Sequence, residues 1–175
     1  MTARRNPPQP GPVHGAGTWW RGQRGEWLVV IQVVLMALVA IGPRSIGGWP
    51  PWAFPVPRVT STVGTALVLL GGGVFLLSLV RLGPSLTALP YPKPDGSLVE
   101  RGPYAFVRHP IYAGGIIVSL GWALVVQSWL TLTYAVVLFV FLDLKARREE
   151  RWLVERYPGY RDYQRRVRKL VPFVY

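Results

Sequence analysis

The sequence contains no cysteine, so it can form no disulfide, no thiolate metal site and no cysteine nucleophile. Charged residues are also scarce: they make up 16% of the 175 residues, against about 25% in ordinary soluble domains. Half of the chain is hydrophobic, and eight residues are tryptophan. This balance indicates a membrane protein of about one domain.

Several catalytic sets are missing as well. The two histidines, with no cysteine, cannot supply a zinc site, so we predict no metal. His14 lies in a Pro-, Gly- and Arg-rich stretch and is expected to be incidental. No strand followed by a GxGxxG turn is evident, which argues against a Rossmann domain. Ser97 and Asp95 near His109 do not follow the order of a Ser-His-Asp triad.

Four apolar stretches predict an all-α integral membrane fold. We expect a flexible basic tail at 1–25 and one membrane domain at 26–175, with spans at about 27–42, 62–80, 111–126 and 129–142. The last two stretches are short and should form a tight helical hairpin. Its second helix should continue into the cytosol to about Arg156, before Pro158-Gly159.

Two segments allow a second interpretation. The first apolar run also fits a signal peptide, but similar segments follow it, so we favour an uncleaved span. Gly71-Gly72-Gly73 lacks the strand and lysine of a phosphate loop, and we expect it to allow close helix packing.

The net charge of +12 is explained by its position along the chain. Four Lys and Arg residues lie in 1–25, four in 81–108 and ten from Lys145 onward, which is 18 of the 20. Four spans place all these on one side, and the positive-inside rule makes that side the cytoplasm. Both termini are then cytoplasmic, and a nucleic-acid partner is not needed to explain the charge.

The stretch around His109 can be understood in two ways. Pro110 suits the first position of a helix whose free amides would favour an anionic group, with His109 alongside. On spacing alone, a simple helix cap is the favoured interpretation.

Glu149-Glu150 likewise fits a solvated helix face, because Lys145 and Glu149 are spaced as an i,i+4 pair. The alternative is a ligand site, for which the two carboxylates point about 100° apart, so that only one faces a given ligand. Tyr157, Tyr160 and Tyr163 either close over such a site or lie in the aromatic belt at the interface, and the belt is the favoured interpretation.

Together, three motifs resemble the isoprenylcysteine carboxyl methyltransferases and the related membrane phospholipid methyltransferases. They are Gly96-Ser-Leu-Val-Glu-Arg-Gly-Pro-Tyr-Ala-Phe-Val-Arg-His-Pro-Ile-Tyr112, Glu149-Glu150-x-x-Leu153, and Tyr157-Pro-Gly-Tyr-Arg-Asp-Tyr163 followed by Pro172. The resemblance covers about residues 96–175. It implies an integral membrane enzyme that uses S-adenosylmethionine without a Rossmann domain.

The resemblance also implies residue roles, in a site formed by 96–112 and 145–163. The residues expected around the cofactor are Gly96, Ser97, Leu98, Val99, Tyr104, His109, Pro110, Ile111, Tyr112, Glu149 and Glu150. Lys145 stands where carboxyl methyltransferases usually place an arginine toward the substrate, and lysine keeps the charge but not the bidentate fork.

The expected function is methyl transfer from S-adenosylmethionine to a lipophilic acceptor at the cytoplasmic face of a membrane, and the favoured acceptor is a carboxylate, as in isoprenylcysteine-type carboxyl methylation. Phospholipid N-methylation is the alternative, for which Glu149, Glu150 or a tyrosine would act as the base. Alternatives of other classes are an NADPH-dependent membrane reductase and a non-catalytic membrane adaptor. The composition, with Arg over Lys, suggests a bacterial plasma membrane. The sequence leaves the acceptor and the oligomeric state open.

Overall fold

The computed structural model describes residues 25–47, 52, 56–87, 89, 96–172, 174 and 175. The expected basic tail at 1–24, with His14, lies outside this part, as does Asp95. The described helices are α1 Glu26–Ile41, α2 Pro57–Leu82, η2 Gly83–Ser85, η3 Gly102–Ala105, α3 Pro110–Val125, α4 Trp129–Arg156 and α5 Tyr160–Arg166. The described residues contain no named strand, only an isolated bridge between Val107 and Arg168. The all-helical class is confirmed.

Helix boundaries follow the predicted spans closely, except at the start of α2. This helix begins at Pro57, five residues before the predicted span. Pro57 needs no donor in the first turn, and the Thr60 hydroxyl donates to its carbonyl at 2.9 Å, so polar residues extend the helix beyond the apolar run. α4 also runs to Arg156, as expected from the sequence.

Two helical stretches are long and apolar enough to cross a membrane. They are Pro57–Ser85, with 29 residues, and Trp129–Arg156, with 28 residues. At 1.5 Å per residue, α4 is about 42 Å long and exceeds the roughly 30 Å hydrocarbon core. α1 and α3 have 16 residues each, so the count of four spans stays a prediction.

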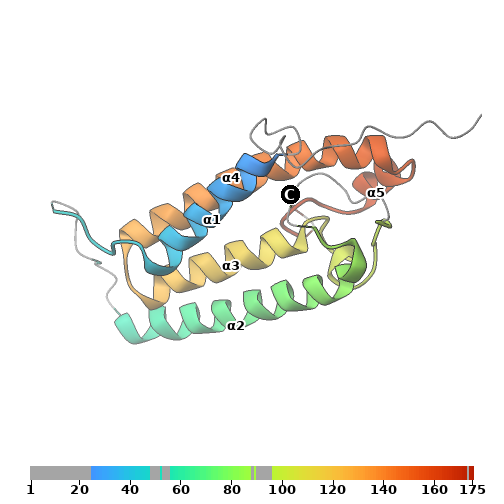
Figure 1. Ribbon diagram of the computed structural model, residues 1–175. Coiled ribbons are helices and arrows are strands. Elements are labelled where there is room, and N and C mark those ends of the chain that lie inside the picture. Colours follow the sequence, from blue (N-terminus) through green and yellow to red (C-terminus); the bar gives the residue numbers. More distant parts are fainter. Residues whose placement is uncertain (1–24, 48–51, 53–55, 88, 90–95, 173) are drawn as a thin grey trace, which may run out of the picture.

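The helices pack with α3 at the centre (Figure 1). α3 lies between α2 and α4, and α1 packs on α4 and α3. The buried core draws Val39, Ile116, Leu138, Leu142 and Leu170 from three helices and the C-terminal segment. Leu69 and Val80 on α2 remain largely exposed, which suits a lipid-facing surface.

Two glycine pairs bring α2 and α3 into backbone contact. A Cβ atom on Gly64 would lie 2.6 Å from the carbonyl oxygen of Gly121, and one on Gly71 would lie 2.8 Å from that of Gly114. Neither position tolerates a side chain without moving a helix. Gly72, in contrast, meets nothing within 4 Å. The expected packing role of the triplet therefore holds at Gly71 and not at Gly72.

Two tyrosines of α5 are buried inside the protein. Tyr160 and Tyr163 of α5 are 1% and 2% exposed, so the prediction of an interfacial belt is wrong for both. Their neighbours along the chain then pair with the loop before α3: the amide of Arg108 donates to the carbonyl of Arg168 at 2.8 Å. The physical reason is a repeated apolar spacing at 160, 163, 167 and 170, which gives this segment a buried side.

Candidate active site

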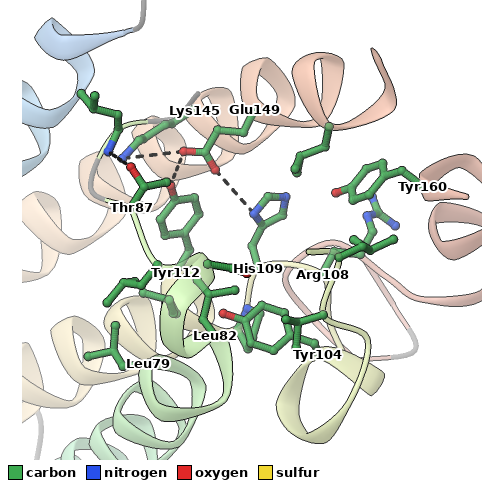
Figure 2. Close-up of a pocket in the computed structure, with 18 of the residues that line it drawn as sticks. Leu79, Leu82, Thr87, Tyr104, Arg108, His109, Tyr112, Lys145, Glu149 and Tyr160 are labelled. Carbon is green, nitrogen blue, oxygen red and sulfur yellow. Dashed lines mark hydrogen bonds and ion pairs between the residues drawn. The ribbon is translucent and has the colours of Figure 1, made fainter. Parts of the chain in front are cut away.

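A cavity of about 420 Å³ lies at one end of the bundle, where α4 extends past the start of α3. Figure 2 shows side chains from α2, α3, α4 and α5 around it. Ten of the residues expected at the site line this cavity: Ser97, Leu98, Val99, Tyr104, His109, Pro110, Ile111, Tyr112, Lys145 and Glu149. The two stretches predicted to meet, 96–112 and 145–163, therefore do meet.

Glu149 is the glutamate that faces the cavity. Its Oε1 accepts a hydrogen bond from the Tyr112 hydroxyl at 2.5 Å and lies 3.8 Å from Lys145 Nζ. Its Oε2 lies 3.7 Å from His109 Nδ1. Figure 2 shows these groups turned toward one another from α3 and α4. One carboxylate, one imidazole, one phenol and one ammonium thus converge at the same point.

Glu150 does not line the cavity and holds the loop before α3 instead. Its Oε1 accepts from Arg108 Nε at 2.7 Å and lies 3.2 Å from His109 Nε2. Its Oε2 accepts from Gln164 Nε2 at 3.0 Å. Arg108 Nη1 also donates to the carbonyls of Gln164 and Val167. The two adjacent glutamates point different ways, as the helical geometry requires.

His109 occupies the N-cap position of α3, but its side chain makes no capping hydrogen bond. Its ring instead stacks on Tyr112 at 5.5 Å, nearly parallel at 5°, and its nitrogens face Glu149 and Glu150. The ring is 8% exposed and in the cavity wall. The capping interpretation therefore does not describe the side chain, although Pro110 does begin the helix.

Lys145 is buried in the middle of this group, with 3% of its surface exposed. Its ammonium lies 5.2 Å from the centre of the Tyr112 ring and donates to Gln32 Oε1 of α1 at 2.5 Å. Gln32 was not among the residues expected at the site. The signal was present, because Gln32 is the single polar residue inside the first apolar run.

The opposite end of the cavity is aromatic and supports the backbone of 96–99. Tyr157 donates to the carbonyl of Gly96 at 2.8 Å, so Gly96, which does not line the cavity, fixes the residues that do. Tyr163 donates to the carbonyl of Tyr104 at 2.6 Å. Burial raises the pKa of Tyr104 to about 12, so this phenol stays protonated.

The residues around the cavity are suited to binding and orienting a ligand. The described residues hold no group of three His, Cys, Asp or Glu side chains able to bind a metal ion. The cavity instead combines charged side chains, Glu149 and Lys145, with aromatic and apolar ones such as Tyr104 and Leu98. Figure 2 shows Tyr104 on the far side of His109 from Lys145 and Glu149. Such a cavity suits a ligand that is itself part polar and part flat and apolar.

Comparisons with known proteins identify methyltransferases among those similar to this chain. The chain is 29% identical over 174 residues to methanethiol S-methyltransferase of Pseudomonas deceptionensis, covering 88% of this chain and 63% of that protein. It is 30% identical over 120 residues to protein-S-isoprenylcysteine O-methyltransferase of Schizosaccharomyces pombe, covering 66% and 51%.

Among solved structures, the fold is similar to the eukaryotic intramembrane Ras methyltransferase ICMT, isoprenylcysteine carboxyl methyltransferase. The TM-score is 0.61 at 21% identity, over 93% of this chain and 55% of that one. The chain thus spans between about half and two thirds of the length of these proteins. The family model described as phospholipid methyltransferase matches residues 59–159, and the chain belongs to this family.

Proposed function

We propose that residues 26–175 form a membrane methyltransferase domain that uses S-adenosylmethionine and methylates a lipophilic carboxylate. The observation that carries this proposal is the convergence of Glu149, His109, Tyr112 and Lys145 on one cavity closed by residues 97–99. In a non-catalytic adaptor the polar residues would point apart instead of converging on a cavity. Their convergence argues against that alternative.

The residues around the cavity fit S-adenosylmethionine. Its volume of about 420 Å³ lies within the usual range for small-molecule sites, about 300–1,000 Å³. The Glu149 carboxylate and the backbone of 97–99 suit the cationic and the nucleoside parts of that molecule respectively. When bound, S-adenosylmethionine supplies a methyl group that its sulfonium has already activated.

The chain's own task is then to orient the acceptor and exclude water. Lys145 supports a carboxylate acceptor, because an ammonium has three donors and Gln32 takes only one. An ionised carboxylate carries no proton to remove, so methylation of its oxygen requires no general base. Glu149 can therefore remain a ligand of the cofactor.

Phospholipid N-methylation is the alternative, and the family match supports it. An ethanolamine nitrogen must lose a proton before or during methylation. Glu149 is then the candidate base, since it lies in the cavity wall and already accepts a hydrogen bond from Tyr112. The two acceptors thus give Glu149 different tasks.

We infer that the cavity opens at the cytoplasmic face, with both termini on that side. The arginine-rich end of α4 and α5 supports this, by the positive-inside rule. The absence of cysteine makes the test simple. In bacterial spheroplasts, an impermeant maleimide should label Ser45→Cys directly and label Asp162→Cys only after lysis. The reverse pattern would overturn the orientation.

The activity is tested with purified protein in nanodiscs and S-adenosylmethionine labelled in its methyl group. N-acetyl-S-farnesylcysteine, phosphatidylethanolamine and a short alkyl thiol are offered as separate acceptors. A carboxyl methyl ester releases volatile methanol in alkali, whereas an N-methyl or S-methyl product keeps the label. We expect alkali-labile product from the first acceptor.

Three results would contradict the proposal. Retention of NADPH without retention of S-adenosylmethionine would favour the reductase. Alkali-stable product from phosphatidylethanolamine, lost in Glu149→Gln, would favour N-methylation. If the double variant Glu149→Gln, His109→Ala binds the cofactor as tightly as the wild type, the cofactor site is not the one proposed.

A further inference from the structure

Tyr160 places a buried hydroxyl in the cavity wall without a hydrogen-bond partner among the described residues. The residue is 1% exposed, and Figure 2 shows its oxygen turned toward the side where His109 and Glu149 lie. A buried hydroxyl without a partner costs free energy, so native proteins nearly always satisfy such groups. A group that enters the cavity would supply the missing partner.

A hydroxyl without a partner is not a general feature of the tyrosines of α5. Tyr163, one turn along the same helix, is equally buried, and its hydroxyl donates to the carbonyl of Tyr104 at 2.6 Å. The two rings pack edge to face at 5.7 Å. Tyr163 therefore supports the fold, whereas the hydroxyl of Tyr160 makes no contribution to it.

The position of Tyr160 indicates which part of a ligand it meets. Tyr160 belongs to an apolar cluster against which Leu98, Leu153 and Tyr157 pack. It lies at one end of the cavity, where Arg108 is the charged neighbour, while Lys145 and Glu149 form the other, charged end. A flat, uncharged purine nucleoside fits the first end, and the charged amino-acid part of a methyl donor fits the second. Burial raises the pKa of Tyr160 well above its ordinary value, so the phenol is a donor at neutral pH.

We propose that the Tyr160 hydroxyl donates a hydrogen bond to a ring nitrogen or ribose oxygen of the bound nucleoside. This inference rests on the proposed use of S-adenosylmethionine. It assigns Tyr160 as a ligand-binding residue in addition to those expected from the sequence, and it makes α5 part of the cofactor site.

The test compares two ligands that share the nucleoside. S-adenosylhomocysteine carries the amino-acid part, and 5′-methylthioadenosine lacks it. Tyr160→Phe should weaken both by the same factor, about two- to tenfold, which is the usual range for one neutral hydrogen bond. Its melting temperature should not fall, because no bond within the protein is lost. Tyr163→Phe is the matched variant and should lower the melting temperature.

Each other outcome has a distinct meaning. Equal binding of both ligands by Tyr160→Phe and wild type would overturn the inference, with water as the partner of the hydroxyl. A loss confined to S-adenosylhomocysteine would place the contact at the amino-acid end and overturn the nucleoside assignment. Failure of the wild type to bind S-adenosylhomocysteine would instead overturn the proposed function, and the inference with it.

A second measurement avoids dependence on a variant that removes the hydroxyl. 3-Fluorotyrosine introduced at position 160 keeps that group, and its ¹⁹F resonance should shift when 5′-methylthioadenosine binds. The same label at position 163 should shift less, since that hydroxyl is already held by Tyr104. An unchanged resonance at 160 under saturating ligand would refute the contact.

Discussion

Replacing Glu150 by glutamine should lower the stability of the protein while leaving the cavity wall in place. Glu150 accepts from Arg108 Nε at 2.7 Å and lies 3.2 Å from His109 Nε2, and the two partners of this ion pair are 11% and 12% exposed. Glutamine keeps the shape and one carbonyl oxygen but removes the charge. The loop before α3 then loses its main ionic link to α4.

The expected cost follows from the burial of the pair. Removing one partner of a fully buried pair costs about 3–5 kcal/mol, and a hydrogen bond to a charged group contributes about 1.5–3 kcal/mol. Arg108 keeps two backbone acceptors, the carbonyls of Gln164 and Val167, so the cost should lie below that of a fully buried pair and within the range for one hydrogen bond to a charged group. We expect a loss of about 2–3 kcal/mol, which lowers the melting temperature by about 4–12 °C for a protein of this size.

The assay is thermal unfolding in detergent micelles together with cofactor affinity, and Glu149→Gln is the matched variant. Glu149→Gln keeps the Tyr112 hydrogen bond through its amide oxygen, and the ion pairs it loses, at 3.7 and 3.8 Å, are longer than the 2.7 Å pair of Glu150, so its melting temperature should fall less. Its affinity for S-adenosylhomocysteine should fall by about 10- to 100-fold, as expected for a lost charged hydrogen bond. Equal stability losses in the two variants would refute the assignment of separate roles to these neighbours.

Three further predictions concern helix packing, a buried ion pair and the acceptor. Gly71→Ala should be less stable than Gly72→Ala by about 1–3 kcal/mol in denaturant unfolding, because only the first Cβ meets a helix backbone; equal stabilities would contradict the contact. Lys145→Gln should lower turnover of a carboxylate acceptor at least tenfold while cofactor affinity stays within about twofold, and unchanged turnover would remove Lys145 from acceptor binding. Asp143→Asn should lower the melting temperature by several degrees, because the carboxylate pairs with buried Lys169 in the protein, and a neutral result would show that the pair is solvated.

The helices could be predicted from the sequence because long apolar runs and Pro110 mark them directly. The start of α2 could not be predicted, because polar side chains such as that of Thr60 donate hydrogen bonds to carbonyls of their own helix and so extend it beyond the apolar run. No apolar pattern records such a bond. The triplet was predicted to allow close helix packing, which holds at Gly71, but only the fold shows that Gly72 and Gly73 meet nothing within 4 Å.

The site could be predicted as two stretches that meet, and less well as individual contacts. Spacing indicated that Glu149 and Glu150 point apart, but it could not say which one faces the cavity, because that depends on where Arg108 lies. Gln32 was missed because it is far from the motifs in sequence, and only the packing of α1 on α4 brings it to Lys145. Tyr160 was assigned to the membrane interface because aromatic residues near a span usually lie there.

The pairing between the loop before α3 and the C-terminal segment has a consequence for the order of events during synthesis. The amide of His109 donates to the carbonyl of Lys169 at 3.1 Å, so the loop is fastened by a residue made sixty positions later. At a translation rate of about 5–20 residues per second, this delay is about 3–12 s. α1 and α2 are complete before that interval begins, and α3 is made within it. The nascent protein is therefore expected to enter the bilayer first and to acquire its ligand affinity only afterwards.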